Sequence, residues 1–192
     1  MTKLFFDTET TGFVKTNSPW TDPGQPKLVQ IALVQTSDNL EVEQSVCITV
    51  KPNGWEIPEK AAEIHGITHE IATEVGLPLK LAIDAAGAMI AKADEVIGHN
   101  VKFDTNILRC QFAYMAMPMV EPASLFCTME ESKDIVKCPP TEKMLAAGRT
   151  QYKNPKLEEA YKHFTGTDMQ NAHDAMADVQ ATIAVYRGIK GA

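Results

Sequence analysis

The sequence predicts a single α/β domain, in which a mixed β-sheet that begins as an antiparallel meander is flanked by helices. Three apolar segments rich in strand-forming residues, separated by turn residues, occupy the first 50 positions. Helical patterns then dominate, interrupted by one short apolar segment that is typical of a buried strand. At 192 residues the chain is long enough to bury a substantial core, so we expect residues 1–192 to form one domain.

The predicted strands come mainly at the beginning of the chain. Residues 4–9 form an apolar run that turns polar at its end, and residues 27–36 and 42–50 are rich in β-branched side chains. Residues 37–39 form a turn between the second and third strands. Residues 14–26 contain several prolines and a glycine, which predict a loop. We therefore expect a meander with a long loop after its first strand.

The rest of the chain is predicted to be mainly helical. The exception is residues 95–98, a short buried strand between two helices. Residues 128–154 include the pair Pro139-Pro140 and show no clear period, so no element is predicted there. The predicted helices, taken from the spacing of their apolar residues, are 58–64, 68–73, 79–93, 103–115, 157–164 and 174–189.

The composition, 44% hydrophobic and 22% charged, is that of an ordinary globular protein. No apolar run approaches the roughly 20 residues of a membrane-spanning helix. The first residues also lack the apolar stretch of a signal peptide, so we expect a cytoplasmic protein with no membrane partner. The four cysteines include no Cys-x-x-Cys pair, which disfavours a zinc site and predicts free thiols.

The net charge of −7 constrains the class of function only weakly. A nucleic-acid-binding protein usually carries a basic surface, so the acidic total disfavours a protein that coats a duplex. An enzyme that holds a few nucleotides through metal ions remains compatible, because the cations offset the charge of its acidic ligands.

Three short motifs carry residues that could act together. Asp7 and Glu9 lie two positions apart on the first predicted strand, so their side chains point to the same face. Asp104 follows the 95–98 strand near the start of a helix. Each motif alone has an ordinary explanation, because acidic residues are common at exposed strand ends and stabilise helix N-termini.

The third motif contains His173 and Asp178. If both residues were helical, their separation would place them roughly 140° apart around the helix axis. A helix that begins near Asp174, a natural N-cap residue, instead leaves His173 in the preceding loop. From there the histidine can reach the site that Asp178 faces. A lone histidine is more often a surface or core residue, so this motif gains weight only from the others.

The combination and order of these motifs resemble those of the DEDDh family of 3′–5′ exonucleases, which includes the proofreading subunit of bacterial DNA polymerase III. The resemblance covers nearly the whole chain, with support from residues 30–32, 65–68 and 155–157. The three segments that carry it are FFDTETTGF at 5–13, GHNVKFD at 98–104 and HDAMADV at 173–179.

The resemblance implies a ribonuclease-H-like fold, with a five-stranded mixed sheet and helices on both sides, as one exonuclease domain. A sister group places a catalytic tyrosine four residues before its last aspartate. That position is Asp174 here, whereas a histidine stands five residues before Asp178, so the histidine subtype is favoured. The residues that match the family's metal-binding acids and general base are Asp7, Glu9, Asp104, Asp178 and His173.

Electrostatics supports a role for cations at such a site. Four ionised carboxylates about 5 Å apart would repel by roughly 3 kcal/mol per pair at an effective dielectric constant near 20. The total approaches the stability of a whole domain, so the cluster must take up protons or bind cations. Oxygen ligands favour Mg²⁺ or Mn²⁺, and two such ions would straddle the scissile phosphate while His173 takes a proton from water.

The implied reaction removes nucleoside monophosphates from the 3′ end of DNA that is single-stranded or frayed. The backbone at Thr10 and Thr11 resembles the family's contact to the terminal 3′-hydroxyl. His65 resembles the segment beside the last base, and Asn100 and Phe103 lie near a metal-binding acid. For His65 and Phe103, packing in the core is an equal alternative.

Other functions remain open at this point. An RNA-trimming enzyme of the same family would use identical chemistry, because the choice depends on contacts near the 2′-hydroxyl. A non-catalytic nucleic-acid-binding module is disfavoured because all five functional positions are filled. The sequence shows no polymerase domain, which favours a free-standing exonuclease, although association with a polymerase is also compatible.

Overall fold

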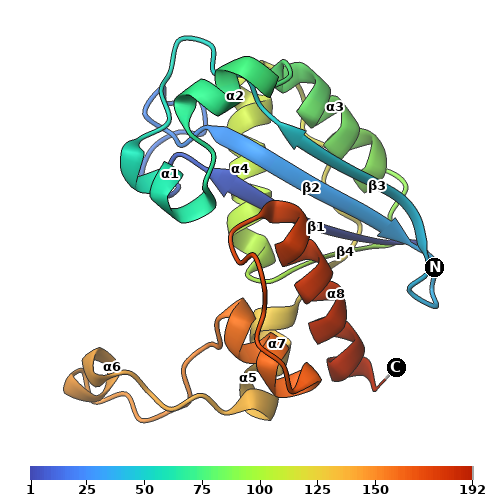
Figure 1. The fold of residues 1–192 in the computed structure, drawn as a ribbon, viewed down its shortest axis with the longest axis vertical. Coiled ribbons are helices and arrows are strands. Elements are labelled where there is room, and N and C mark those ends of the chain that lie inside the picture. The colour runs from blue at the N-terminus through green and yellow to red at the C-terminus, as the bar shows by residue number, and fades with distance from the viewer. Residues whose placement is uncertain (192) are drawn as a thin grey trace.

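The computed structural model describes residues 1–191 and contains one five-stranded sheet with helices on both faces (Figure 1). The strand order is β3-β2-β1-β4-β5, which places the first strand in the middle. The predicted fold class, a five-stranded mixed sheet flanked by helices, is confirmed. Among the described residues, no helix is long and apolar enough to cross a membrane.

The antiparallel meander consists of β1 (Lys3–Thr10), β2 (Leu28–Thr36) and β3 (Val42–Thr49). β1 and β2 are buried along most of their length, because their apolar side chains contact helices on both faces. β3 lies at the edge of the sheet and is largely exposed, in keeping with its many polar residues. These strands match the predicted ones to within one residue at each end.

Two parallel strands complete the sheet on the other side of β1. β4 (Glu95–Gly98) pairs in parallel with β1, and β5 (Leu125–Cys127) pairs in parallel with β4. β5 was not located from the sequence, because it has only three residues and its first one is exposed. Parallel pairing brings the carboxyl ends of β1 and β4 to the same edge of the sheet.

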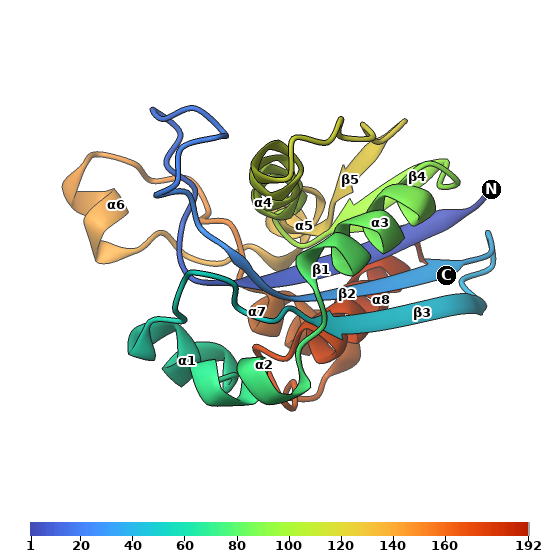
Figure 2. The same cartoon turned by 90° about the horizontal axis from the view of Figure 1, so that it is seen from above.

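Helices α3 (Leu79–Ile90) and α4 (Val101–Tyr114) cover one face of the sheet (Figure 2). α8 (Ala175–Lys190) covers the other face, and α7 (Leu157–Thr165) packs against α8. The side chains of β1 point alternately to the two faces of the sheet, so this strand contributes to the core under the helices on each face. Leu4 and Phe6 belong to the core under α3 and α4, whereas Phe5 packs edge-on against Tyr186 of α8. The predicted helices are confirmed, with ends shifted by at most three residues.

Two short helices, α1 (Glu59–His65) and α2 (His69–Val75), lie beside the carboxyl end of β1. Gly66 ends α1 in the left-handed conformation, with φ of 74°. The Thr68 hydroxyl then accepts a hydrogen bond from the backbone N–H of Ile71 and caps α2. The pair packs on Val29 and Ile57 in a small separate core. The sharp turn between the helices therefore fixes His65 in place.

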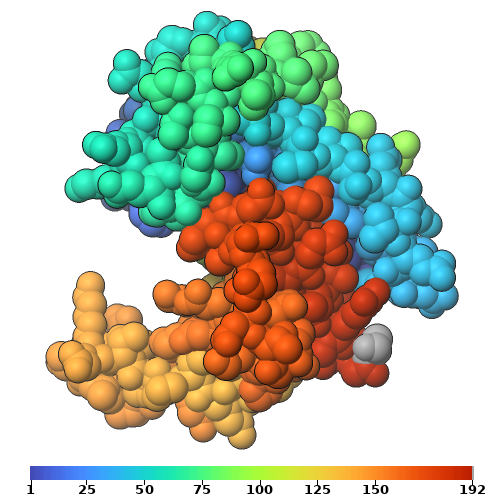
Figure 3. Space-filling view, in the orientation of Figure 1, coloured from blue at the N-terminus to red at the C-terminus, as the bar shows by residue number. Residues whose placement is uncertain are grey.

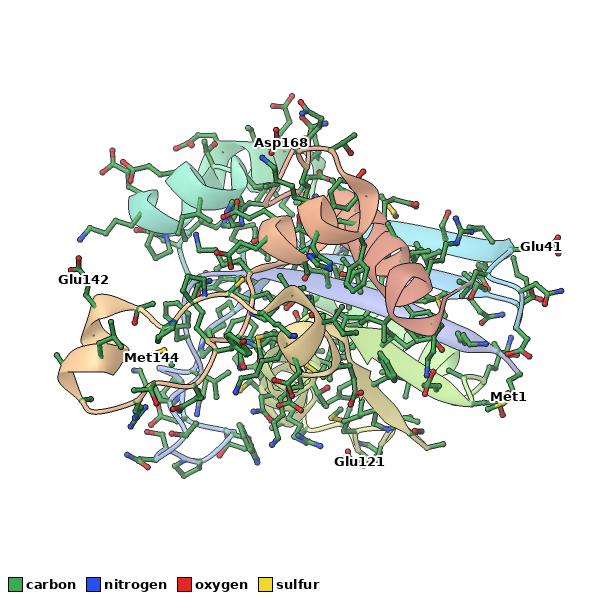
Figure 4. The ribbon with its side chains drawn as sticks, turned by 90° about the horizontal axis from the view of Figure 1, so that it is seen from below. Met1, Glu41, Glu121, Glu142, Met144 and Asp168 are labelled. Carbon is green, nitrogen blue, oxygen red and sulfur yellow. The ribbon has the colours of Figure 1, made fainter. Side chains whose placement is uncertain are left out.

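Residues 128–154, for which no element was predicted, contain α5 (Thr128–Val136) and α6 (Glu142–Ala146). Part of residues 128–154 projects from the molecule as an arm, and α6 lies at its tip, with Glu142 and Met144 far from the sheet (Figure 4). The outline in Figure 3 is notched between this arm and the segment that contains α1. None of the α6 residues is buried, so apolar periodicity could not indicate the helix.

The base of the arm is attached to the sheet through His99, which directly follows β4. Its ring nitrogens lie 3.0 Å from the hydroxyl of Thr128 and 3.0 Å from the carbonyl oxygen of Pro155. Burial lowers the pKa of His99, so the neutral ring is favoured. This histidine of the GHNVKFD segment therefore joins β4 to both ends of the arm.

Candidate active site

The carboxyl end of β1 supplies the first two acids of the site. Asp7 and Glu9 point to the face covered by α8, two residues apart on the same strand. Glu9 is 8% exposed and lies opposite Gln30 of β2 in the antiparallel register. Because β1 is the central strand, both carboxylates lie at the middle of the sheet edge, within reach of neighbouring elements.

Asp104 reaches this sheet edge from the first turn of α4. Its Oδ1 accepts hydrogen bonds from the backbone N–H of Thr8 at 3.0 Å and from the Thr8 hydroxyl at 2.7 Å. α4 begins at Val101, two residues before the predicted start, because Asn100 turns the chain into the helix with φ of 73°. Thr8 points away from the face of Asp7 and Glu9, so it fastens Asp104 to β1 from the other side.

The start of α8 supplies the remaining two residues. Asp174 is the N-cap, and its side chain accepts a hydrogen bond from the backbone N–H of Ala177 at 2.9 Å, as predicted. His173 precedes the helix, with φ of 69°, in the loop position expected from the sequence. Its backbone N–H donates to Oδ1 of Asp178 at 3.2 Å. The left-handed turn thus places His173 and Asp178 side by side.

Gln30 connects this helix start to the sheet. Its Oε1 accepts a hydrogen bond from the backbone N–H of Ala175 at 3.2 Å, and its Nε2 donates to the hydroxyl of Thr49 at 3.2 Å. The side chain is 8% exposed. Gln30 was not predicted to take part in the site, although it is a polar residue within the apolar run of β2.

The five predicted residues converge at this sheet edge. Ligand-capable atoms of Glu9, His173 and Asp178 all lie within 4.8 Å of one another. Asp7 lies close enough to Asp104, Asp178 and Glu9 for their charges to act on its ionisation. Residues from the first strand, the fourth helix and the last helix therefore share one site.

Burial is the main cause of unusual pKa values in this group, and repulsion between the carboxylates adds to it. The pKa of Asp7 lies well above its ordinary value. The pKa of Glu9 rises to about 8, that of Asp104 to about 7 and that of Asp178 to about 6. The hydrogen bonds from Thr8 to Asp104 and from His173 to Asp178 partly oppose these increases.

These properties fit a site for divalent cations. The donors are carboxylate oxygens, the ligands that Mg²⁺ and Mn²⁺ prefer, with one imidazole beside them. Without cations Glu9, with its pKa of about 8, keeps its proton near neutral pH, whereas bound cations would stabilise the charged forms of the carboxylates. Asp7, Glu9, Asp104 and Asp178 are thus suited to hold metal ions, with His173 at the exposed side of the cluster.

A pocket of about 420 Å³ adjoins the cluster and has Glu9 in its wall. Of the predicted substrate-binding residues, Thr10, Thr11, His65 and Phe103 line it, whereas Asn100 does not and lies exposed at the start of α4. Phe13 and Lys60, which were not predicted to bind substrate, also line it. The exposed Phe13 ring packs edge-on against Phe103, with centroids 6.0 Å apart.

His65 presents an unused polar atom in this region. Its Nδ1 accepts a hydrogen bond from the backbone N–H of Ile67 at 3.1 Å, and its buried Nε2 has no partner among residues 1–191. Burial and the nearby His173 lower the pKa of His65. Because Nδ1 accepts this hydrogen bond, the neutral ring carries its proton on Nε2.

Comparison with known families decides the classification. The family model RNase_T, described as an exonuclease, matches residues 4–186. The chain belongs to this exonuclease family. The DEDDh resemblance is therefore confirmed, and the chain is an exonuclease by family.

Solved exonuclease structures share the fold. A zinc-bound complex of E. coli exonuclease I with single-stranded DNA is 24% identical in sequence to this chain, with a TM-score of 0.76. The match covers 99% of this chain and 40% of the exonuclease I chain. E. coli exonuclease I with a dT13 oligonucleotide has 25% identity, a TM-score of 0.74 and coverage of 98% and 41%. Exonuclease I from Methylocaldum szegediense has 24% identity, a TM-score of 0.69 and coverage of 99% and 40%.

This exonuclease thus spans about two-fifths of the length of these structures. A comparison with curated protein sequences gave no match. The structural likeness therefore supports the fold.

Proposed function

We propose that this exonuclease uses two divalent metal ions, Mg²⁺ or Mn²⁺, to release nucleoside monophosphates from the 3′ end of single-stranded DNA. The observation that carries the proposal is the convergence of four carboxylates and His173 beside a pocket of about 420 Å³. The similar exonuclease I structures with single-stranded oligonucleotides support this substrate class.

The chain's own residues suit the individual tasks of hydrolysis. Bound ions would supply Lewis-acid stabilisation of the scissile phosphate and lower the pKa of the attacking water. Asp7, Glu9, Asp104 and Asp178 would hold these ions, and Asp104 is oriented for this by Thr8. His173, exposed beside Glu9 and Asp178, would accept the proton of the attacking water.

The pocket suits the terminal nucleotide of a strand. Its wall is mainly apolar and includes Phe13, Phe103 and Ile64, against which a base could stack. Thr10 and Thr11 line the pocket next to Glu9, where a 3′-hydroxyl would lie beside the metal-binding acids. His65 Nε2 provides a donor at the same place.

The test is cleavage of a 5′-labelled single-stranded oligonucleotide with Mg²⁺, with Mn²⁺ and with a chelator. We expect a ladder that shortens from the 3′ end only when metal is present. Asp7→Ala and Asp178→Ala should abolish the ladder while the thermal unfolding transition persists, and Asp134→Ala on the exposed face of α5 is the matched control. Wild-type turnover by either active-site variant would refute the assignment.

The same assay separates the possible substrates. A mismatched duplex and a short RNA are tested in parallel with the single strand, and the ratio of their kcat/KM values identifies the preferred substrate. Faster cleavage of RNA than of DNA would replace the proposed substrate while leaving the chemistry of the site unchanged.

A further inference from the structure

A second pocket, of about 330 Å³, lies at the same end of the sheet, and its walls include two aromatic and two basic residues. It is formed where the chain leaves β3 and where α3 begins and α4 ends. Trp55 and Tyr114 contribute rings, and Tyr114 is 47% exposed. We define the lysine–aromatic groove by six of its lining residues, Lys51, Trp55, Leu79, Lys80, Tyr114 and Met115.

The charge of this groove is opposite to that of the whole protein. Lys51 and Lys80 line it, and no Asp or Glu does so among the described residues, although the net charge is −7. Lys80 is paired with the exposed Asp84 at 2.6 Å, one helical turn away. Lys27 adds a further cation, with Nζ 4.3 Å from the centre of the Tyr114 ring. An anion with a flat aromatic part matches these walls.

The groove is connected to the active-site pocket by direct contacts. Thr11 lines the active-site pocket, and its backbone N–H donates to the carbonyl oxygen of Lys27 at 3.0 Å. The backbone N–H of Lys27 in turn donates to the Thr11 hydroxyl at 2.8 Å. The Lys27 side chain then reaches Tyr114. Asp104 and Tyr114 lie ten residues apart on α4, about 15 Å along the helix axis.

We propose that the lysine–aromatic groove binds a nucleotide of the substrate strand on the 5′ side of the nucleotide being removed. The base stacks on Trp55 and Tyr114, and the phosphate lies near Lys51. Stacking on aromatic rings depends little on the identity of the base, so the groove binds a single strand of any nucleotide sequence while its 3′ end is in the active site. This inference rests on the proposed function, because it assigns the groove to the same strand.

The first experiment measures binding without cleavage. Trp55 is the only tryptophan left in a Trp20→Phe variant, since the chain has two. Addition of a dT15 oligonucleotide in the presence of a chelator should quench its fluorescence, and Lys51→Glu should weaken this binding about tenfold. Lys92→Glu, the same charge change just beyond the other end of α3, is the matched control and should leave the affinity within twofold.

The second experiment measures dependence on strand length. Trp55→Ala and Tyr114→Ala should each raise KM for dT15 about tenfold, with kcat nearly unchanged and with no change in either constant for a dinucleotide. Equal loss on both substrates would mean that the active site is distorted, and it would overturn the inference. An unchanged KM for dT15 in both variants would overturn it as well.

The two experiments separate this inference from the proposed function. Quenching by dT15 with no cleavage of any strand would refute the proposed function and leave the groove as a strand-binding site. Cleavage from the 3′ end without quenching, and without a length-dependent KM change, would retain the enzyme and refute the groove. Quenching by dTMP as strong as that by dT15 would also refute it, because a site for a strand must prefer the strand.

Discussion

Thr8 donates two hydrogen bonds, one from its backbone and one from its hydroxyl, to a single oxygen of Asp104. The two residues are 96 positions apart in sequence and are both buried. The contact joins β1 to the first turn of α4 and fixes the orientation of the Asp104 carboxylate. It also stabilises the charged form of this carboxylate, which burial disfavours. It is therefore a link between the packing of the fold and the proposed metal site.

We predict that Thr8→Val lowers the affinity for Mg²⁺ without unfolding the protein. Valine has a similar shape but lacks the hydroxyl, so Asp104 keeps only the backbone hydrogen bond. A hydrogen bond to a charged group contributes about 1.5–3 kcal/mol, so the Mg²⁺ concentration at half-maximal activity should rise roughly tenfold. Thr8→Ser keeps the donor and should behave like the wild type. Equal metal requirements in all three proteins would contradict the role given to Thr8.

Gln30→Met is predicted to loosen the start of α8. The substitution keeps the length of the side chain but removes the acceptor for the backbone N–H of Ala175 and the donor to Thr49. We expect a loss of about 1–2 kcal/mol in the free energy of unfolding and a fall in kcat larger than any change in KM. Hydrogen exchange at the Ala175 amide should accelerate, and an amide that stays as protected as in the wild type would rule this account out.

The pH dependence of stability follows from the raised pKa values of the acids. Folding raises the pKa of Glu9 to about 8 and that of Asp104 to about 7, so the folded state binds more protons than the unfolded state. Their stabilising contribution is complete below the unfolded pKa values, near 4, and is lost as pH rises through 7 and 8. In the presence of a chelator, Tm should therefore fall between pH 5 and pH 8.5.

Mg²⁺ should reverse this trend, because cations stabilise the ionised carboxylates of the folded state. The increase in Tm on adding Mg²⁺ should be larger at pH 8 than at pH 5.5, as measured by calorimetry in both conditions. Asp7→Asn, which removes one of the mutually repelling charges, should flatten the decline seen with chelator. A chelated wild-type protein that is more stable at pH 8.5 than at pH 5 would contradict the assignment.

A close backbone approach at Gly76 gives a prediction about stability alone. A Cβ atom at this position would lie 2.2 Å from the carbonyl oxygen of Ala72 and 2.6 Å from the backbone nitrogen of Lys51. Both neighbours are backbone atoms, so Gly76→Ala should lower the free energy of unfolding by about 1–3 kcal/mol, as measured by chemical denaturation. Gly54→Asn is the control, since that glycine has open space around it and asparagine tolerates its φ of 73°.

The central elements were predictable because their local sequence and their environment agree. β1 and β2 are apolar runs that are buried on both faces, and α8 starts at an aspartate that caps it. The same alternation that placed Leu4 and Phe5 on opposite faces put Asp7 and Glu9 on one face. The resemblance to the DEDDh family then pointed to four acids and His173 as candidate site residues, and the structure brings their side chains together.

The supporting contacts could not be predicted from the sequence, because they depend on distant partners. Nothing near Thr8 in the sequence indicates a hydrogen bond to Asp104. Likewise, Asn100 was expected at the substrate because it is close to Asp104 in sequence, yet its left-handed conformation leaves it outside the wall of the active-site pocket. α6 has no buried face, so no apolar period could indicate it.

The hydrogen bond between Gln30 and Ala175 spans 145 positions, so the last helix completes an arrangement begun by the first two strands. This contact needs residues from near both ends of the described chain, so it cannot form before α8 has been synthesised. During synthesis β1 and β2 emerge long before α8, and on the proposed chemistry such an unfinished chain would lack both its base and its final metal ligand. A nascent chain would thus remain harmless to nucleic acids until folding ends.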